Sequence, residues 1–260
     1  MAGGTVRVER DGTIATVVLS SPGRMNALDK TMWSQLGAAM AELGADESLR
    51  CIVIRGDGDK AFAAGADIAE FKNERANSAQ ARAYSRGGIG WMHSVAECRH
   101  PTVALIQGAC VGGGLLIASQ CDLRLCNESA RFGVPVKNLG LTESYDELQA
   151  MMRVVGPAVS LELLLEGRIW GAKEAGEKGL VSRVVADDKV VEEAYATARR
   201  IADGAPLVAR WHKKFVRRLL DPRPLTQEER DEGYACFDTE DFKAGVAAFL
   251  AKQKPKFQGR

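Results

Sequence analysis

The 260-residue chain lacks an excess of charge of either sign, since 35 Lys and Arg residues stand against 34 Asp and Glu residues. A protein that binds nucleic acid through bulk charge carries a clear basic excess, so we expect no nucleic-acid partner. The sequence also lacks an uninterrupted apolar run as long as a membrane span, and we expect no membrane contact. The first twelve residues contain no apolar core segment, and we expect no leader peptide there.

The sequence is poor in metal-binding and redox motifs. Its six cysteines show no CxxC spacing, and most lie in apolar segments, as is typical of buried free thiols. No grouping of His, Cys and Asp has the spacing of metal ligands, so we expect no metal site. These features favour a reducing, cytoplasmic location. Of the three histidines, His93 lies in a helical stretch, whereas His100 and His212 adjoin basic residues and are predicted to face solvent.

Motifs of several common enzyme classes are missing as well. No Gly-x-Ser-x-Gly elbow of a serine hydrolase occurs. A glycine triplet at 112–114 is not followed by the Gly-Lys-Ser/Thr of a phosphate loop, and it lacks the spacing of a dinucleotide-binding fingerprint. The triplet therefore needs another explanation.

Strand and helix patterns alternate through about residue 130. Strands are predicted at 5–10, 13–20, 51–56, 101–108 and 123–127, and helices at 28–43 and from the glycine triplet to near Cys121. Such alternation predicts crossover connections and a mostly parallel sheet. Helical patterns dominate the remainder, at 144–156, 157–167, 171–179, 190–206 and 241–253. We expect an α/β core domain over residues 1–200 and a helical C-terminal region over residues 201–260.

The glycine triplet precedes an apolar helix, and a second loop of small residues, "KAFAAGADIAEF" at 60–71, also follows a strand. A helix N-terminus exposes unpaired N–H groups, and glycine lets a negative atom approach them closely. Two loops that follow parallel strands can present N–H groups at the same sheet edge, where they would hold an enolate or thioester oxygen. Tight packing of the helix against a strand is the alternative reason for the triplet alone.

Several motifs of this sequence occur in the same order in a known family. They are "AFAAGADI", "VGGG", "CDLR", "ARFGVP", "EAGEKGLVSRVV" and "CFDTEDFKAG". From about Val6 to its end, the chain resembles the crotonase (enoyl-CoA hydratase/isomerase) superfamily. The resemblance implies an α/β spiral of repeated ββα units with a helical C-terminal extension. It also implies an acyl-CoA thioester as substrate, with coenzyme A as part of that substrate and no tightly bound cofactor, and a homotrimer or homohexamer.

The resemblance assigns roles to particular residues. The N–H groups of Ala66 and Gly113 would hold the thioester oxygen. The path of the adenine and pantetheine groups would be lined by Arg24, Met25, Ala27, Ala64, Asp67 and Ile68. C-terminal residues would help to cover coenzyme A, often across a subunit boundary, and these are Phe237, Phe249 and Lys252. For Phe249, a core position on an amphipathic helix is an alternative.

The sequence departs from the family at two catalytic positions. Hydratases that it resembles use two glutamates, and the matching positions here are Leu116 and Val136. Neither side chain can accept or donate a proton. General acid–base assistance contributes roughly 10²–10⁴ in rate, so ordinary hydration is not expected.

The loop 140–148, "GLTESYDEL", is the best alternative source of a proton-transfer group. Glu143 is the candidate base, because it precedes the helix and has no evident helical role. Ser144 and Glu147 fit a capping box, and Asp146 would lie in the first helical turn, so these residues are interpreted as structural. Candidates for shaping the acyl pocket are Phe71, Trp91, Met92 and Tyr145.

Three functions are compatible with these residues. The first is an acyl-CoA isomerase in which Glu143 lifts a proton from one carbon and returns it to another, while the two amides carry the enolate charge. The second is decarboxylation or C–C cleavage of an acyl-CoA. The third is a CoA-thioester-binding protein without catalysis.

Overall fold

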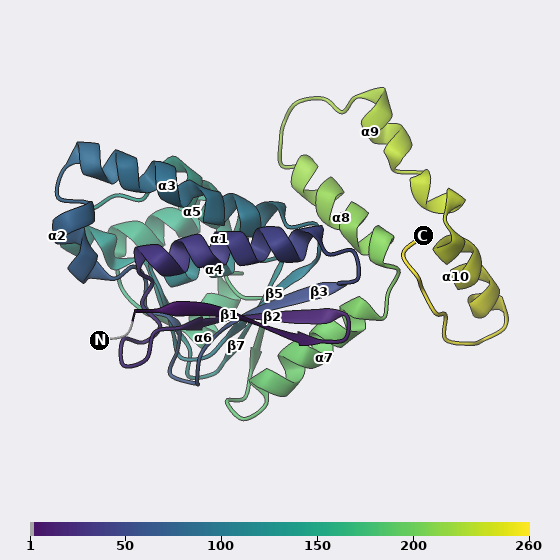
Figure 1. Cartoon of the computed structure of the whole chain (residues 1–260), viewed down its shortest axis with the longest axis horizontal. Helices are drawn as coiled ribbons and strands as arrows, with labels where there is room; N and C mark the ends of the chain where they lie inside the picture. The colour runs from purple at the N-terminus through teal and green to yellow at the C-terminus, as the bar shows by residue number, and fades with distance from the viewer. Residues whose placement is uncertain (1–2) are drawn as a thin grey trace.

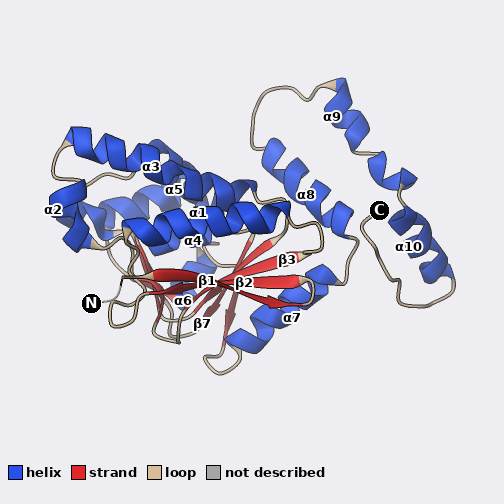
Figure 2. Ribbon diagram, in the orientation of Figure 1, coloured by secondary structure: helices blue, strands red, loops and turns tan. Residues whose placement is uncertain are grey.

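The computed structural model describes residues 3–260, except for the side chains of residues 86–93. The predictions made for Trp91, Met92 and His93 therefore fall outside the described side chains. Two β-sheets and a set of surrounding helices make up the body of the molecule, and the C-terminal helices extend away from it (Figures 1 and 2).

The larger sheet has six strands in the order β1-β2-β3-β5-β7-β10. Only the β1–β2 pair is antiparallel, and the other neighbours run parallel, as predicted. Its strands are β1 (Thr5–Asp11), β2 (Ile14–Ser20), β3 (Cys51–Gly56), β5 (Thr102–Ile106), β7 (Leu123–Asn127) and β10 (Arg183–Val185).

A smaller sheet of four short strands has the order β4-β6-β8-β9. Its strands are β4 (Ala61–Ala63), β6 (Ala109–Val111), β8 (Arg131–Gly133) and β9 (Trp170–Gly171). Each of β3, β5 and β7 is followed by a strand of this smaller sheet and then by a helix. This repetition is the ββα spiral that the resemblance implied.

Ten α-helices lie within the described part of the chain. They are α1 (Lys30–Ala45), α2 (Phe71–Glu74), α3 (Ser78–Glu97), α4 (Gly113–Gln120), α5 (Tyr145–Glu166), α6 (Ala172–Glu177), α7 (Val190–Ala202), α8 (Pro206–Arg218), α9 (Gln227–Glu232) and α10 (Glu240–Leu250). Asp29 fixes the start of α1, because its carboxylate accepts hydrogen bonds from the N–H groups of Met32 and Gly4 at 2.9 Å.

Strands β2, β3, β5 and β7 of the larger sheet are almost entirely buried, so their alternate residues enter two different cores, whereas most residues of β1 and β10 are exposed. In β3, Ile52 and Ile54 point into the main core with α1 and α4, whereas Cys51 and Val53 face α7. Five of the six cysteines are buried and Cys236 is partly buried, and all are free thiols. The prediction of buried free thiols is therefore confirmed for most of them.

Helix α5 passes a test of length and mean hydropathy for a membrane span, although its apolar sequence is interrupted by charges. The test considers length and composition alone, and core helices of other proteins also meet it. A break at Gly156, where φ is 73°, precedes Pro157 and divides the helix in two. This break separates the two helices that the sequence predicted.

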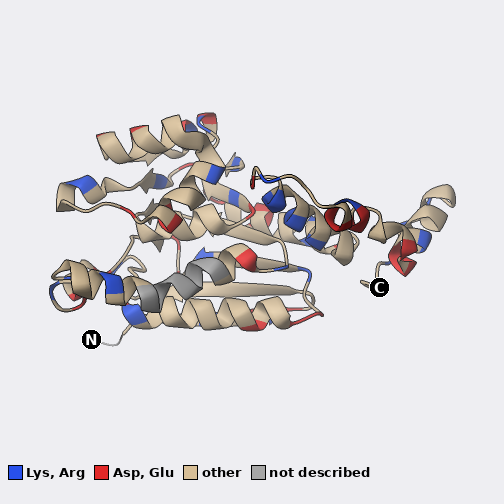
Figure 3. Ribbon diagram, turned by 90° about the horizontal axis from the view of Figure 1, so that it is seen from above, with Lys and Arg blue, Asp and Glu red and all other residues tan. Residues whose placement is uncertain are grey.

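The C-terminal region forms an arm (Figure 1). Helix α8 is tied to the body by Lys213 and Arg217, which contact the Asp122 carboxylate at 2.7 and 2.9 Å. The final residues turn back onto α10, where Asp241 accepts hydrogen bonds from the N–H groups of Gln258 and Gly259. Acidic and basic residues occur together on most helices (Figure 3). The division into residues 1–200 and 201–260 stays a prediction.

Candidate active site

A cavity of about 480 Å³ lies where the loop after β4, the N-terminus of α4 and the segment 135–147 meet helices α2 and α3. Its floor is backbone, from residues 64–66 and 111–113, and its sides are mostly apolar. Both small-residue loops identified in the sequence therefore border one space. They do so because β4 and β6 are parallel neighbours, which places the ends of both strands at the same sheet edge.

The N–H groups of Ala66 and Gly113 are not used within the described structure. Leu28 forms a parallel bridge with the loop, in which its N–H donates to the Gly65 carbonyl at 2.8 Å and its carbonyl accepts from Asp67 at 2.9 Å. In this pairing the Ala66 N–H donates no hydrogen bond. Gly113 is the first residue of α4, so its N–H has no carbonyl one turn earlier to bond.

The two amides are close neighbours. A Cβ atom built on Gly113 would lie 3.6 Å from the Ala66 nitrogen, and one built on Gly65 would lie 3.5 Å from the Gly113 nitrogen. Both groups therefore border the same small volume, and the dipole of α4 adds positive potential there. An oxygen bearing negative charge fits this place.

Each glycine of the triplet is required for a different reason. Gly112 has φ 51° and ψ −123°, a conformation that strongly favours glycine. A Cβ on Gly113 would enter the amide site and approach the Trp33 ring to 2.9 Å. A Cβ on Gly114 would collide with the Ala63 carbonyl oxygen at 2.2 Å. Tight packing of the helix against a strand, the alternative explanation, accounts for Gly114, while Gly113 is packed against the Trp33 ring and also borders the amide site.

Glu143 and Glu147 are the two acids that line the cavity, and both are partly buried. Burial raises the pKa of Glu143 to about 8, and the neighbouring Glu147 carboxylate adds to this effect by its charge and by a side-chain hydrogen bond. Glu147 is held in the predicted capping box, where its Oε2 accepts the Ser144 N–H at 2.6 Å and its own N–H donates to the Ser144 hydroxyl.

The two positions that the resemblance assigned to glutamates, Leu116 and Val136, also line this cavity. Leu116 projects from the first turn of α4 and Val136 from the 3₁₀ segment after β8. Both surround the amide site with hydrocarbon. The titratable side chains of the lining are Arg75, Tyr84, Glu143 and Glu147.

The residues expected along the coenzyme path fall into two groups. Segments 24–27 and 64–68 lie together, since the Ala64 N–H donates to the Met25 carbonyl at 3.0 Å and Arg24 contacts the Asp67 carboxylate at 2.5 Å. The C-terminal residues Phe237, Phe249 and Lys252 do not line the cavity of their own chain. They belong to the arm, far from α2 and α3 (Figure 1).

Two expectations about side chains near the site are wrong. His100 is fully buried rather than solvent-facing, and burial together with nearby arginines lowers its pKa to about 4. Tyr145 neither lines the cavity nor packs, because it is 91% exposed on the outer side of the first turn of α5. His212 is exposed and Phe71 lines the cavity, both as expected. No group of three potential ligands for a metal is found among the described residues.

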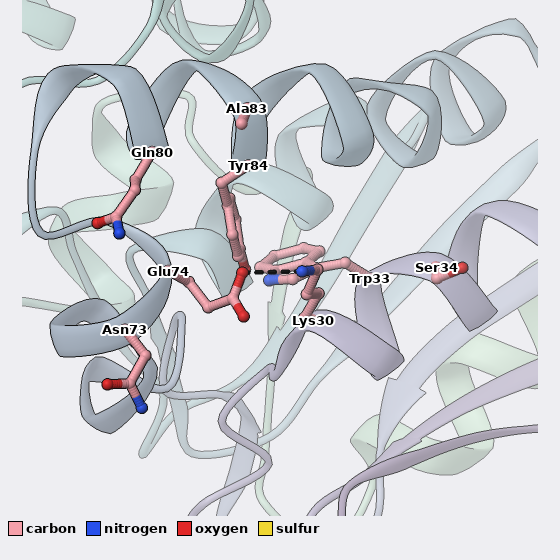
Figure 4. Close-up of a pocket in the computed structure, with 8 residues that line it drawn as sticks. All are labelled: Lys30, Trp33, Ser34, Asn73, Glu74, Gln80, Ala83 and Tyr84. Carbon is pink, nitrogen blue, oxygen red and sulfur yellow. Dashed lines mark hydrogen bonds and ion pairs between the residues drawn. The ribbon is translucent and has the colours of Figure 1, made fainter.

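Sequence reasoning missed several residues of the cavity wall, and three of them have large side chains. Trp33 comes from α1, Arg75 follows α2, and Tyr84 comes from α3. Trp33 and Tyr84 also border a second cavity of about 310 Å³ on the outer side, where Lys30 and Glu74 form an ion pair at 2.8 Å (Figure 4). No motif marks these positions, because the three helices meet only in the folded chain.

Comparisons with known proteins agree on one family. A family model described as "Enoyl-CoA hydratase/isomerase" matches residues 9–260. A protein of Rhizobium meliloti (strain 1021) named "Probable enoyl-CoA hydratase" is 38% identical over 266 residues, which cover 98% of each chain. A "Crotonyl-CoA hydratase" of Syntrophomonas wolfei is 32% identical over 99% of each chain. A solved structure from Magnetospirillum magneticum, titled as an enoyl-CoA hydratase/carnithine racemase, is 49% identical with a TM-score of 0.97 and covers 100% of this chain and 97% of its own.

Proposed function

Because the chain belongs to the enoyl-CoA hydratase/isomerase family, we propose that it binds an acyl-CoA thioester and stabilises its enolate. The thioester oxygen would lie between the N–H groups of Ala66 and Gly113. One observation carries this proposal. The two N–H groups are adjacent, they border a cavity, and neither donates a hydrogen bond within the described structure. One such donor typically contributes roughly 10²–10³ in rate.

The nucleotide end of coenzyme A would follow the paired segments 24–27 and 64–68. The ion pair between Arg24 and Asp67 fixes one segment against the other, so this path is preorganised. Phe237, Phe249 and Lys252 would cover the coenzyme of a neighbouring subunit in a homotrimer or homohexamer. The high exposure of Phe249, 83%, supports such a role, because a large apolar side chain that covers nothing in its own chain is costly to hydrate.

We favour isomerase-type chemistry over hydration. A hydratase must activate water and protonate carbon, whereas Leu116 and Val136 offer only hydrocarbon beside the amides. Glu143 would remove a proton from the carbon next to the thioester carbonyl and return the same proton two carbons further along, so the double bond moves and no atom is gained or lost. A pKa near 8 suits a group that both accepts and returns a proton near neutral pH.

Two alternatives use the same amides. Decarboxylation or C–C cleavage of an acyl-CoA needs enolate stabilisation and little acid–base equipment, so the apolar lining is compatible with it. A binding protein without catalysis is compatible with the missing glutamates, and it would use the two N–H groups to hold the thioester oxygen, but it assigns no role to the Glu143 carboxyl in the cavity.

Proton exchange in heavy water tests the proposal, because it reports enolate formation whatever the natural substrate. Thermal-shift measurements with butyryl-CoA, crotonyl-CoA and longer thioesters would first identify bound ligands, with free coenzyme A as the control. We expect NMR to show enzyme-dependent deuterium entry next to the carbonyl of a bound thioester, and the enoyl absorbance of crotonyl-CoA to persist in water. Binding without any exchange would favour the non-catalytic alternative. Rapid loss of the enoyl absorbance would show that the protein hydrates crotonyl-CoA, and it would contradict our preference for isomerisation.

A further inference from the structure

Arg75 lies at the end of α2 and lines the same cavity as the two amides. Its guanidinium carbon is 3.9 Å from the centre of the Tyr84 ring and 4.6 Å from that of Phe71. Tyr84 points from α3 toward Trp33 of α1 (Figure 4), so Arg75 stacks on a side chain that is itself packed. Cation–π contacts with both rings hold the planar guanidinium in place.

Arg75 has no carboxylate partner. Within the described structure it forms no ion pair, and its Nε is enclosed by protein atoms without a hydrogen-bond partner. Its charge acts on the Tyr84 hydroxyl, with which it shares a side-chain hydrogen bond, and on the Glu143 carboxyl, whose pKa it lowers. Other cations close to the site are paired, since Lys30 binds Glu74 and Arg24 binds Asp67. A guanidinium with an unsatisfied donor is a site where an anion gains more than it does in water.

The acids of the cavity do not fill this role. Glu147 is turned to the Ser144 N–H by the capping box. The charge of Arg75 lowers the pKa of Glu143, but burial and the Glu147 carboxylate raise it by more, so the neutral acid is favoured and does not cancel the charge of Arg75. A neutral Glu143 can itself donate a hydrogen bond to an anion.

The remaining lining suits a hydrocarbon chain. Leu116, Val136, Leu139 and Leu141 border the space together with the two amides and Arg75. The cavity therefore offers N–H donors for a thioester oxygen, apolar walls and one stacked cation. This set of groups suits an acyl chain that ends in a carboxylate.

We propose that Arg75 binds a terminal carboxylate of the acyl group, so that the substrate class is the CoA monothioester of a dicarboxylic acid. This inference rests on the proposed function, because it assumes that the amides hold a thioester. Arg75 acts here as a specificity residue.

Calorimetric titration of matched thioester pairs tests the inference. The pairs are succinyl- and butyryl-CoA, glutaryl- and valeryl-CoA, and adipyl- and hexanoyl-CoA, in which each acid is compared with a neutral chain of equal length. We expect at least one diacid to bind roughly tenfold or more tightly than its neutral partner, as a charge-assisted hydrogen bond implies. γ-Butyrobetainyl-CoA, whose chain ends in a cation, should bind more weakly than valeryl-CoA.

Variants separate recognition from a structural role. Arg75→Gln should bring the affinity ratio of the preferred pair to about one while leaving the neutral thioester within roughly threefold of the wild type. Arg75→Lys keeps the charge and should retain part of the ratio. Arg82→Gln is the matched control, because it removes one positive charge from an exposed position of α3 that does not line the cavity.

Different failures refute different claims. Ratios near one for all three pairs in the wild type would overturn the inference even if no variant folded. Equal weakening of acid and neutral thioesters in Arg75→Gln would also overturn it, because that result indicates a structural role. In both cases the neutral thioesters still bind, so the proposed function stands. If no thioester binds, the proposed function and this inference are both wrong.

Discussion

Replacement of Glu143 by glutamine tests two consequences of one buried acid. The substitution keeps the shape of the neutral carboxylic acid and removes its ability to ionise. If Glu143 is the base, exchange next to the thioester carbonyl should fall by roughly 10²–10⁴, the usual contribution of general base catalysis. Binding of a neutral thioester such as butyryl-CoA should change little, because the amides hold its oxygen.

The pH dependence follows from the raised pKa. With a pKa of about 8, roughly one tenth of Glu143 is ionised at pH 7 and roughly nine tenths at pH 9. Exchange by the wild type should therefore rise about tenfold between these values and then level off. Glu143→Gln should show no such rise.

The free energy of unfolding should fall as the pH rises, whereas the exchange rate rises. The pKa in the folded state lies above the ordinary value of 4.5, so the proton stabilises the folded state. That contribution is fully present below pH 4.5 and is lost as the pH rises toward 8, with a slope of at most about 1.4 kcal/mol per pH unit. Glu143→Gln removes this slope, so its free energy of unfolding should match the wild type near pH 4 and exceed it at pH 8.

Deuterium exchange by NMR and urea unfolding across pH 4–9 measure both effects. Asp146→Asn is the control, since Asp146 is an exposed acid three residues away that does not line the cavity. An unchanged exchange rate in Glu143→Gln would show that another group moves the proton. A wild-type rate that levels off below pH 6 would show that Glu143 is ionised at neutral pH, and the reasoning from burial would be wrong.

Three further predictions concern other parts of the molecule. Gly113→Ala should reduce exchange by about 10² or more and lower the melting temperature, because its methyl group enters the amide site and meets Trp33; normal exchange would exclude the amide pair. Arg24→Ala, which loses the 2.5 Å contact with Asp67, should weaken the affinity for free coenzyme A by roughly tenfold in calorimetry, and an unchanged affinity would place the coenzyme elsewhere. Phe249→Glu should reduce the mass seen in sedimentation if the exposed ring packs between subunits, and an unchanged mass would remove it from the interface.

Strands β2, β3, β5 and β7 of the larger sheet could be predicted because each is five to seven residues long and strongly apolar. Strand β1 is more polar but was also predicted, whereas the three-residue β10 was not. The smaller sheet could not be predicted from pattern, because β6 and β8 have three residues each. Three residues show no periodicity, and their pairing depends on where the longer strands end. Only the resemblance to a family implied their presence.

The candidate site, like the fold, could be predicted from the sequence only in part. The small-residue loops and the capping box are local in sequence, so both could be recognised there. The environment of Glu143 is not local, because its electrostatic neighbour Arg75 comes from a segment 68 residues earlier. His100 shows how local sequence can mislead. Its basic neighbours in sequence led to the prediction that it faces solvent, but it lies just before the buried strand β5 and its ring is in the interior.

If the proposed function is correct, the site shows how one half of a family's chemistry can be kept when the other half changes. Side-chain carboxylates are lost by single substitutions, and Leu116 and Val136 occupy the walls where they would lie. The amide donors belong to the backbone, so a substitution removes them only by blocking or moving the chain. Two glycines keep the donors in place and accessible. Gly112 adopts a positive φ, and Gly113 has no side chain that would fill the space next to the Ala66 N–H. Enolate stabilisation can therefore persist while the proton-transfer group moves to a different loop, and Glu143 stands on such a loop.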